Sequence, residues 1–294
     1  MPPKPLSPLA FDTRTTPVRS DLAAARLRGI VTAPHYVEGV ALQVIEPSAP
    51  LRRAPASDAP LDTEALFGEK VTVYDEAEGW AWGQLERDGY VGYLPRVALG
   101  APTAPTHRVA ALRAHAYPGP NIKLAPRMAL ALGARLAIVS QEGDFVATGE
   151  GLYLWARHVA PLEAYESDFV AVAERFLETP YLWGGRTSEG IDCSGLVQTA
   201  LAAAGVGAPR DSDMMEAGLG EPLPSGAALA RGDLVFWKGH VGIMRDGLAL
   251  LHASGWHMMV VSEPLAEARA RIAASGGGEI TGARRLQPET IHGR

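Results

Sequence analysis

Short runs of alternating apolar and polar residues, separated by glycine, proline and acidic turns, fill the chain from about residue 39 to residue 160. Such alternation predicts short, half-buried strands rather than helices. The first four runs are "GVALQVIEP", "EKVTVYDE", "GWAWGQLE" and "GYVGYLPR". Asp88-Gly89, between the last two, is a strong hairpin signal, because glycine adopts the positive φ that tight hairpin turns require.

A second set of runs follows the first and echoes it: "THRVAALRAH", "ARLAIVSQ", "DFVATGEG" and "LYLWARHVA". Gly68 and Gly133 occupy matching positions ahead of an apolar strand in the two copies. A repeat of this kind indicates two copies of one unit, and short twisted strands close into a small barrel more easily than they form an open sheet. We therefore expect two small β-barrels, at residues 33–102 and 103–163, and their pattern resembles that of bacterial SH3-like modules.

The segment before them, residues 1–32, is a proline-rich lead that ends in "SDLAAARLRG". This stretch predicts a short helix with Ser20 or Asp21 as its N-cap. The start of the chain contains no apolar run of the length that a signal peptide or a membrane span requires. We accordingly expect a cytoplasmic protein that does not associate with a membrane.

Helical spacing replaces alternation after residue 164. "SDFVAVAERFLETP" predicts a helix capped by Ser167 or Asp168, and "CSGLVQTALAAAG" predicts a second helix that ends at Gly205. Strands are expected in "DLVFWKG", "HVGIMRDG" and "LALLHASG". Residues 164–294 should thus form an α+β domain with helices first and an antiparallel sheet after them.

Composition excludes several function classes. The net charge of −6 and the pI near 5.8 argue against nucleic-acid binding, which normally shows as a basic excess or stripe. A single cysteine, Cys193, fits a reducing compartment, where a thiol is kept for chemistry rather than for cross-linking. No histidine falls into metal-ligand spacing, and no phosphate-binding loop is present, so we expect neither a metal nor a cofactor. The sequence predicts no oligomeric state.

The candidate chemistry centres on this cysteine. Cys193 begins its predicted helix, where the helix dipole and free N–H groups favour a thiolate. A nucleophilic thiol also needs a base, and His240 and His252 lie on neighbouring strands that can pair as a hairpin. His252 could then orient the His240 ring, as an acid or amide does in other catalytic triads. The alternative for each residue in isolation is a buried small side chain or an ordinary packed histidine.

An ordered set of motifs resembles a known family. "PYLWGG", "GIDCSGLVQ", "PRDS", "RGDLVFW" and "GHVGI" followed by "HASG" are similar to the NlpC-type cell-wall cysteine peptidases, which have a papain-like fold. The resemblance implies Cys193 as nucleophile, His240 as base and His252 as the orienting residue. It also implies that the Tyr181 hydroxyl helps the Cys193 N–H to hold the oxyanion. For Tyr181 and Trp183 the alternative is aromatic packing beside the nucleophile, which we prefer for Trp183.

The resemblance is closer to members with SH3-like domains ahead of the catalytic domain, which are γ-D-glutamyl-L-diamino-acid endopeptidases. In these, the first SH3-like domain walls off one side of the cleft, so that only small muropeptides with a free N-terminal L-alanine fit. A buried ammonium needs carboxylate and hydroxyl partners. The candidates are Asp192, Ser194, Asp211, Ser212 and Tyr90, with Glu64 as a weaker one. Asp192 could equally be only an N-cap, Glu64 a solvated acid, and Arg210 either grips a substrate carboxylate or pairs with a neighbouring acid.

The sequence thus predicts hydrolysis of the γ-D-Glu–diaminopimelate bond of murein peptides during cell-wall peptide recycling. Two alternatives stay open. One is a related amidase or acyltransferase that uses the same residues, and the other is a wall-peptide binding protein with an inactive peptidase domain.

Overall fold

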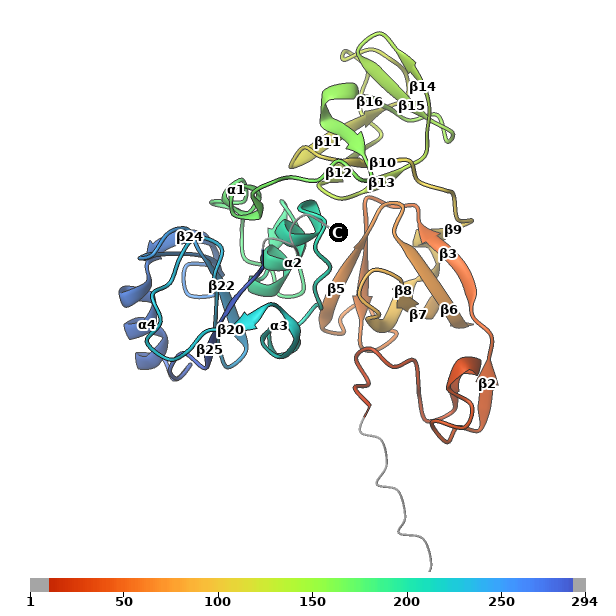
Figure 1. The fold of residues 1–294 in the computed structure, drawn as a ribbon. Coiled ribbons are helices and arrows are strands. Elements are labelled where there is room, and N and C mark those ends of the chain that lie inside the picture. Colours follow the sequence, from red (N-terminus) through yellow and green to blue (C-terminus); the bar gives the residue numbers. More distant parts are fainter. Residues whose placement is uncertain (1–10, 288–294) are drawn as a thin grey trace, which may run out of the picture.

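The computed structural model describes residues 11–287, which form three units around helix α2 (Figure 1). The first unit is one seven-stranded sheet in the order β5-β4-β8-β7-β6-β3-β9. Its strands are β3 (Val40–Val44), β4 (Ser48–Arg52), β5 (Leu61–Leu66), β6 (Lys70–Ala77), β7 (Trp80–Leu85), β8 (Val91–Pro95) and β9 (Leu99–Gly100), with the 3-10 helix η2 (Arg96–Ala98) before β9. The hairpin expected at Asp88-Gly89 is confirmed: it joins β7 to β8, and Gly89 has a φ of 76°.

The second unit repeats this topology. Its two sheets, β12-β11-β16-β15-β14 and β13-β10-β17, follow the same order when read together, with β13 and β14 in the place of β6. A 3-10 helix precedes the last strand here too, and that strand pairs with the first one. The elements are β10 (His107–Val109), β11 (Arg113–Tyr117), β12 (Met128–Ala131), β13 (Arg135–Leu136), β14 (Ile138–Glu142), β15 (Phe145–Thr148), β16 (Tyr153–Trp155), η3 (Ala156–His158) and β17 (Val159–Pro161).

The helix expected over residues 20–29 is wrong. This stretch instead forms strand β1 (Leu22–Ala24), which pairs in parallel with β2 (His35–Val37), and the single-turn 3-10 helix η1 (Ala25–Leu27). All three residues of β1 are buried, in a cluster that includes Trp82 of the first unit. A helix would have turned part of this apolar run toward water, so packing against the first unit overrides the local helix propensity. The proline-rich part of the lead, residues 1–10, and the last residues, 288–294, lie outside the described residues.

The third unit packs helices against a six-stranded antiparallel sheet, in the order β20-β25-β21-β22-β23-β24. The expected caps and ends are largely confirmed: Asp168 caps α1, and Gly205, with a φ of 81°, follows the end of α2. The elements are α1 (Phe169–Glu174), β18 (Arg186–Thr187), β19 (Gly190–Ile191), α2 (Cys193–Ala203), α3 (Ser212–Gly218), β20 (Glu221–Pro222), β21 (Leu234–Trp237), β22 (His240–Met244), β23 (Ala249–Ser254), β24 (Met259–Pro264), α4 (Leu265–Ala274) and β25 (Gly282–Arg285). The main core lies between α1, α2 and one face of this sheet, and α4 covers the other face.

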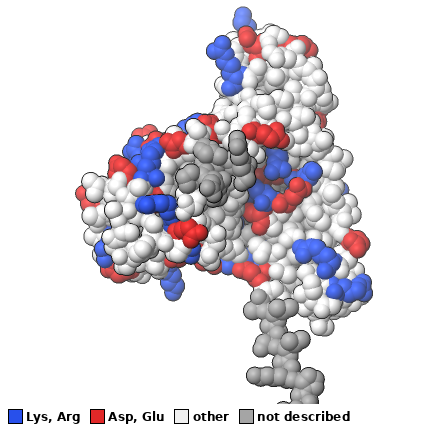
Figure 2. Space-filling view, viewed as in Figure 1, with Lys and Arg blue, Asp and Glu red and all other residues white. Residues whose placement is uncertain are grey.

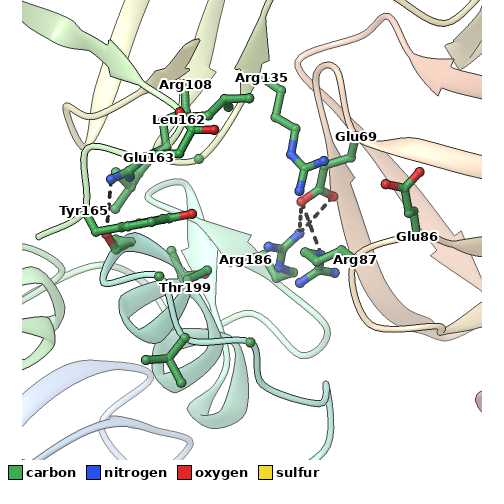
Figure 3. A pocket seen from close by; sticks show the side chains of 17 residues that line it. Glu69, Glu86, Arg87, Arg108, Arg135, Leu162, Glu163, Tyr165, Arg186 and Thr199 are labelled. Atoms are coloured by element: carbon green, nitrogen blue, oxygen red, sulfur yellow. Dashed lines mark hydrogen bonds and ion pairs between the residues drawn. The ribbon is translucent and has the colours of Figure 1, made fainter. Parts of the chain in front are cut away.

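The three units meet around a cavity of about 440 Å³ (Figure 3). Glu69 of the first unit lies at its wall with both oxygens 3.2–3.3 Å from Arg186 Nη1 of the third unit, and Arg87 Nε lies 3.2 Å from the same carboxylate. Arg108 of the second unit donates to the Ala203 carbonyl at the end of α2. These polar contacts hold the first and second units against the third.

The charged residues on the face in Figure 2 are interspersed, blue beside red, without a basic stripe. In residues 11–287 no helix is both long and apolar enough to cross a membrane.

Candidate active site

Cys193 is the first residue of α2, as the sequence predicted. Asp192 caps the helix, because its Oδ1 accepts a hydrogen bond of 2.6 Å from the Gly195 N–H. Helix α2 packs against β22, which begins at His240. The backbone on both sides of His240 reaches the nucleophile: Gly239 lines the same cavity as Cys193, and the Val241 N–H hydrogen-bonds to the thiol.

The expectation that the helix start lowers the pKa of this thiol is wrong for the resting structure. Cys193 is 7% exposed, and burial raises its pKa to about 12, with the nearby Asp192 carboxylate adding to the increase. Hydrogen bonds from the Val241 and Ser194 N–H groups oppose this shift without cancelling it. A helix dipole contributes at most about 2 kcal/mol in favourable geometry, so desolvation of the thiolate outweighs it.

The two histidines lie side by side, as expected. His240 Nε2 is 2.7 Å from His252 Nδ1, and the rings meet edge to face at 5.0 Å. His252 is 1% exposed, and its Nε2 lies 2.7 Å from Glu263 Oε1 on β24. Glu263 in turn pairs with Arg271 of α4.

This chain of contacts determines which nitrogens carry protons. Although burial opposes its charge, hydrogen bonding from His252 and the charge of Arg271 lower the pKa of Glu263, so the ionised carboxylate accepts a hydrogen bond from the His252 Nε2–H. Nδ1 of the neutral His252 is then an acceptor, so His240 Nε2 must be the donor. His240 Nδ1 therefore carries the free lone pair, which is the form that a general base needs.

Burial lowers the pKa of His240 to about 3, and the neighbouring His252 adds to this shift. Because the pKa of the thiol is raised and that of the imidazole is lowered, both groups are neutral at rest. Proton transfer from sulfur to nitrogen then accompanies attack on a substrate rather than preceding it.

A cavity of about 280 Å³ lies next to Cys193, and residues of the first unit form part of its wall. Four carboxylates and two guanidiniums line it, which leaves an acidic excess. They are Asp62, Asp192, Asp211, Asp213, Arg14 and Arg53. Arg14, Arg53, Asp62 and Asp213 were not predicted as site residues, because the sequence around them carries no signal that distinguishes them from solvated charges.

Asp211 and Tyr90 form the part of this wall best suited to an ammonium group. The Tyr90 hydroxyl donates to Asp211 Oδ2 at 3.1 Å, and Arg14 Nη1 donates to the same oxygen at 2.8 Å. Burial raises the pKa of Asp211 even though Arg14 lies beside it, so a further cation would stabilise its charge. Ser212, the first residue of α3, lines the same cavity.

Arg210 pairs with an acid inside the protein. It is 1% exposed and forms a bidentate pair with Asp192, with Nη1–Oδ1 at 3.0 Å and Nη2–Oδ2 at 2.6 Å. It also donates to the Ser194 hydroxyl at 2.8 Å and to Thr63 of the first unit at 2.8 Å. Asp192 and Ser194 line the cavity, but their acceptor atoms are largely occupied by the protein itself.

Glu64 does not line the cavity. Its Oε2 accepts from the Arg186 N–H at 2.8 Å and its Oε1 from the Ser48 hydroxyl at 3.1 Å, so it belongs to the junction between the first and third units. A carboxylate two residues away in the same strand, that of Asp62, lines the cavity instead.

Tyr181 lines the cavity beside Cys193 and is half-buried. Burial and the nearby sulfur and Asp192 raise the pKa of its phenol, so it stays a hydrogen-bond donor. Trp183 lines the same cavity but is 62% exposed, so the preference for packing at this position is wrong.

Known proteins share this architecture. Residues 178–271 match the NlpC/P60 family, and residues 51–99 match the bacterial dipeptidyl-peptidase SH3 domain. The chain is 30% identical over 238 residues to dipeptidyl-peptidase 6 of Lysinibacillus sphaericus, which covers 72% of this chain and 86% of that protein. It is also 30% identical over 224 residues to a γ-D-glutamyl-L-lysine dipeptidyl-peptidase of Bacillus subtilis, which covers 67% of this chain and 73% of that protein.

Among solved structures, an NlpC/P60 family protein from Bacillus cereus superposes with a TM-score of 0.70 at 22% identity. The superposition covers 84% of this chain and 99% of that one. The same three-unit fold therefore occurs outside this chain.

Proposed function

Because the chain belongs to the NlpC/P60 family and is a cysteine peptidase, we propose that it hydrolyses the γ-D-glutamyl bond to the diamino acid in small murein peptides with a free N-terminal L-alanine. The observation that carries the proposal is the acidic cavity beside Cys193, part of whose wall the first unit forms. Its volume, about 280 Å³, lies just below the range of about 300–1,000 Å³ typical of ligand pockets. It suits a short acyl group that ends in an ammonium. The names of two relatives, dipeptidyl-peptidase 6 and γ-D-glutamyl-L-lysine dipeptidyl-peptidase, also support the proposal.

In this proposal, Asp211 and the Tyr90 hydroxyl hold the ammonium of L-alanine, which places the γ-carbonyl of D-glutamate at Cys193. The sulfur attacks the carbonyl carbon as its proton passes to His240 Nδ1. The carbonyl π electrons move to oxygen, and the Cys193 N–H and the Tyr181 hydroxyl hydrogen-bond to that oxyanion.

The C–N bond then breaks, and His240 returns the proton to the leaving amine. This leaves a thioester on Cys193. Water attacks the thioester with His240 Nδ1 again as base, and the sulfur leaves and recovers a proton. We place this activity in cytoplasmic murein-peptide recycling, which the single cysteine in 294 residues supports, since a thiol persists in a reducing compartment.

The test compares L-Ala-γ-D-Glu-meso-diaminopimelate with its N-acetylated form, followed by mass spectrometry. We expect cleavage of the free amine only, and no cleavage by Cys193→Ala. Equal turnover of both peptides would contradict the closed amine cavity. Tight binding of the free-amine peptide by the wild type without cleavage would instead favour the wall-peptide binding protein.

A further inference from the structure

A second cavity, also of about 280 Å³, lies next to the two histidines. His240 and His252 line it together with Trp237, Lys238 and Arg271. No carboxylate lines this second cavity within the described residues, in contrast to the four that line the cavity at Cys193. The cavity that His240 lines is therefore basic, whereas carboxylates predominate in the cavity at Cys193.

Three donors in this second cavity suit a carboxylate ligand. The Trp237 side chain is 1% exposed, and its indole N–H is buried without a hydrogen-bond partner. A buried donor left unpaired costs free energy, about 1–3 kcal/mol, that a ligand acceptor would recover. The exposed Lys238 has no acid within 4.0 Å of its Nζ in the part of the chain that the structure describes, whereas the guanidinium of Arg271 is already paired with Glu263. Lys238 thus supplies the free charge and Trp237 the directed donor.

We propose that this cavity is the subsite for the leaving amino acid and that Trp237 and Lys238 bind its α-carboxylate. This inference rests on the proposed function, because it takes the direction of the substrate from it. His240 must protonate the leaving nitrogen, so the leaving residue lies on the His240 side of the scissile bond. Its α-carboxylate is only two bonds from that nitrogen, which brings it next to the His240 ring.

The protein holds both donors close to this position. Lys238 is in the two-residue turn between β21 and β22, two positions before His240. The Trp237 ring lies 5.7 Å from the His240 ring, and the two residues pair across the same turn. A substrate with an ammonium at one end and a carboxylate at the other can then bind productively in one direction only.

The kinetic test uses L-Ala-γ-D-Glu-L-Lys and the same peptide with a C-terminal carboxamide, so that one carboxylate is present or absent. We expect Lys238→Met to lower kcat/KM for the acid about fivefold and to leave the amide unchanged. Trp237→Phe, which keeps a ring in the core but removes the N–H, should likewise affect the acid selectively. Lys123→Met, an exposed lysine of the second unit, is the matched control and should change neither substrate. Equal losses on acid and amide, or a wild type that cleaves both peptides with the same kcat/KM, would overturn the proposal.

A binding test is independent of turnover. In the Cys193→Ala variant, saturation-transfer NMR should detect binding of free L-lysine in preference to L-lysinamide, and Lys238→Met should abolish that preference. If the wild type cleaves neither peptide but this preference is present, the proposed reaction fails and the carboxylate subsite stands. If cleavage occurs but neither amino acid shows a Lys238-dependent preference, the reaction stands and the subsite is refuted.

Discussion

Arg210 offers the sharpest test of how the first unit stabilises the active site. Replacing Arg210 with methionine removes a buried cation and leaves the Asp192 carboxylate without its ion-pair partner. The same carboxylate caps α2, so the change also affects the start of the Cys193 helix. Breaking a buried ion pair by removing one partner costs about 3–5 kcal/mol, because the remaining charge stays desolvated. We therefore expect Arg210→Met to lower the free energy of unfolding by about that amount and to weaken activity, since the start of α2 loses its electrostatic support.

The structure separates this effect into parts. Thr63→Val removes only the hydrogen bond from Arg210 Nε to the first unit and should cost about 1–3 kcal/mol, because a buried donor is left unpaired. Arg269→Met breaks an exposed pair with Glu279, in which both side chains are more than half exposed, and should cost less than about 1 kcal/mol. Urea unfolding at pH 7 measures all three. An Arg210→Met variant no less stable than Arg269→Met would refute the argument.

Three other predictions concern the catalytic groups. Glu263→Leu should lower kcat about tenfold or more with little change in KM, because His252 loses the acceptor that fixes the tautomers of both histidine rings. Glu263→Gln keeps an acceptor and should restore part of the rate and the shape of the pH profile of kcat. Equal losses in both variants would point to a merely structural role for Glu263. Burial raises the pKa of Cys193 from 9.0 to about 12, so above pH 9 the thiol loses its proton in the unfolded chain before it does so in the folded one. The wild type should therefore lose stability relative to Cys193→Ala, by up to about 1.4 kcal/mol per pH unit. A difference in unfolding free energy between the two proteins that stays constant from pH 8 to 11 would contradict the raised pKa. In steady-state kinetics, Asp211→Asn should raise KM for peptides with a free N-terminal amine about tenfold and leave kcat nearly unchanged. An unchanged KM would show that Asp211 does not bind the amine.

The parts of the fold that depend on local patterns could be predicted from the sequence. The hairpin at Asp88-Gly89, the cap at Asp168 and the start of α2 at Cys193 each depend on residues a few positions apart. The pairing of His240 with His252 followed from two strands joined by a short turn. The strand at Leu22–Ala24 could not be predicted this way, because its burial depends on Trp82, sixty residues later in the chain.

The same reasoning explains which site residues were missed. Glu263 lies on a strand that pairs with the strand of His252, and the apolar run "MMVVSEP" could have indicated it. Asp62 and Arg14 reach the cavity only because the first unit packs against the third. Asp62 and Glu64 are two acids on one strand, and the sequence could not show which of them lines the cavity. That depends on the hydrogen bond from the Arg186 N–H to Glu64, which no local pattern predicts.

The proposed nucleophile and its proposed base come from one unit, whereas selectivity in the proposed reaction depends on several. The Cys193 helix and the His240 strand pack against each other within the third unit. The wall opposite them is supplied by Tyr90 of the first unit and Arg14 of the lead, both of which donate to Asp211. Because a lone ammonium in a closed cavity is costly unless it is paired, weakening the contact between the units should relax the requirement for a free amine before it slows attack by the sulfur. The junction of Arg186 with Glu64 and Glu69, none of which lines the cavity at Cys193, is on this reasoning a determinant of substrate choice.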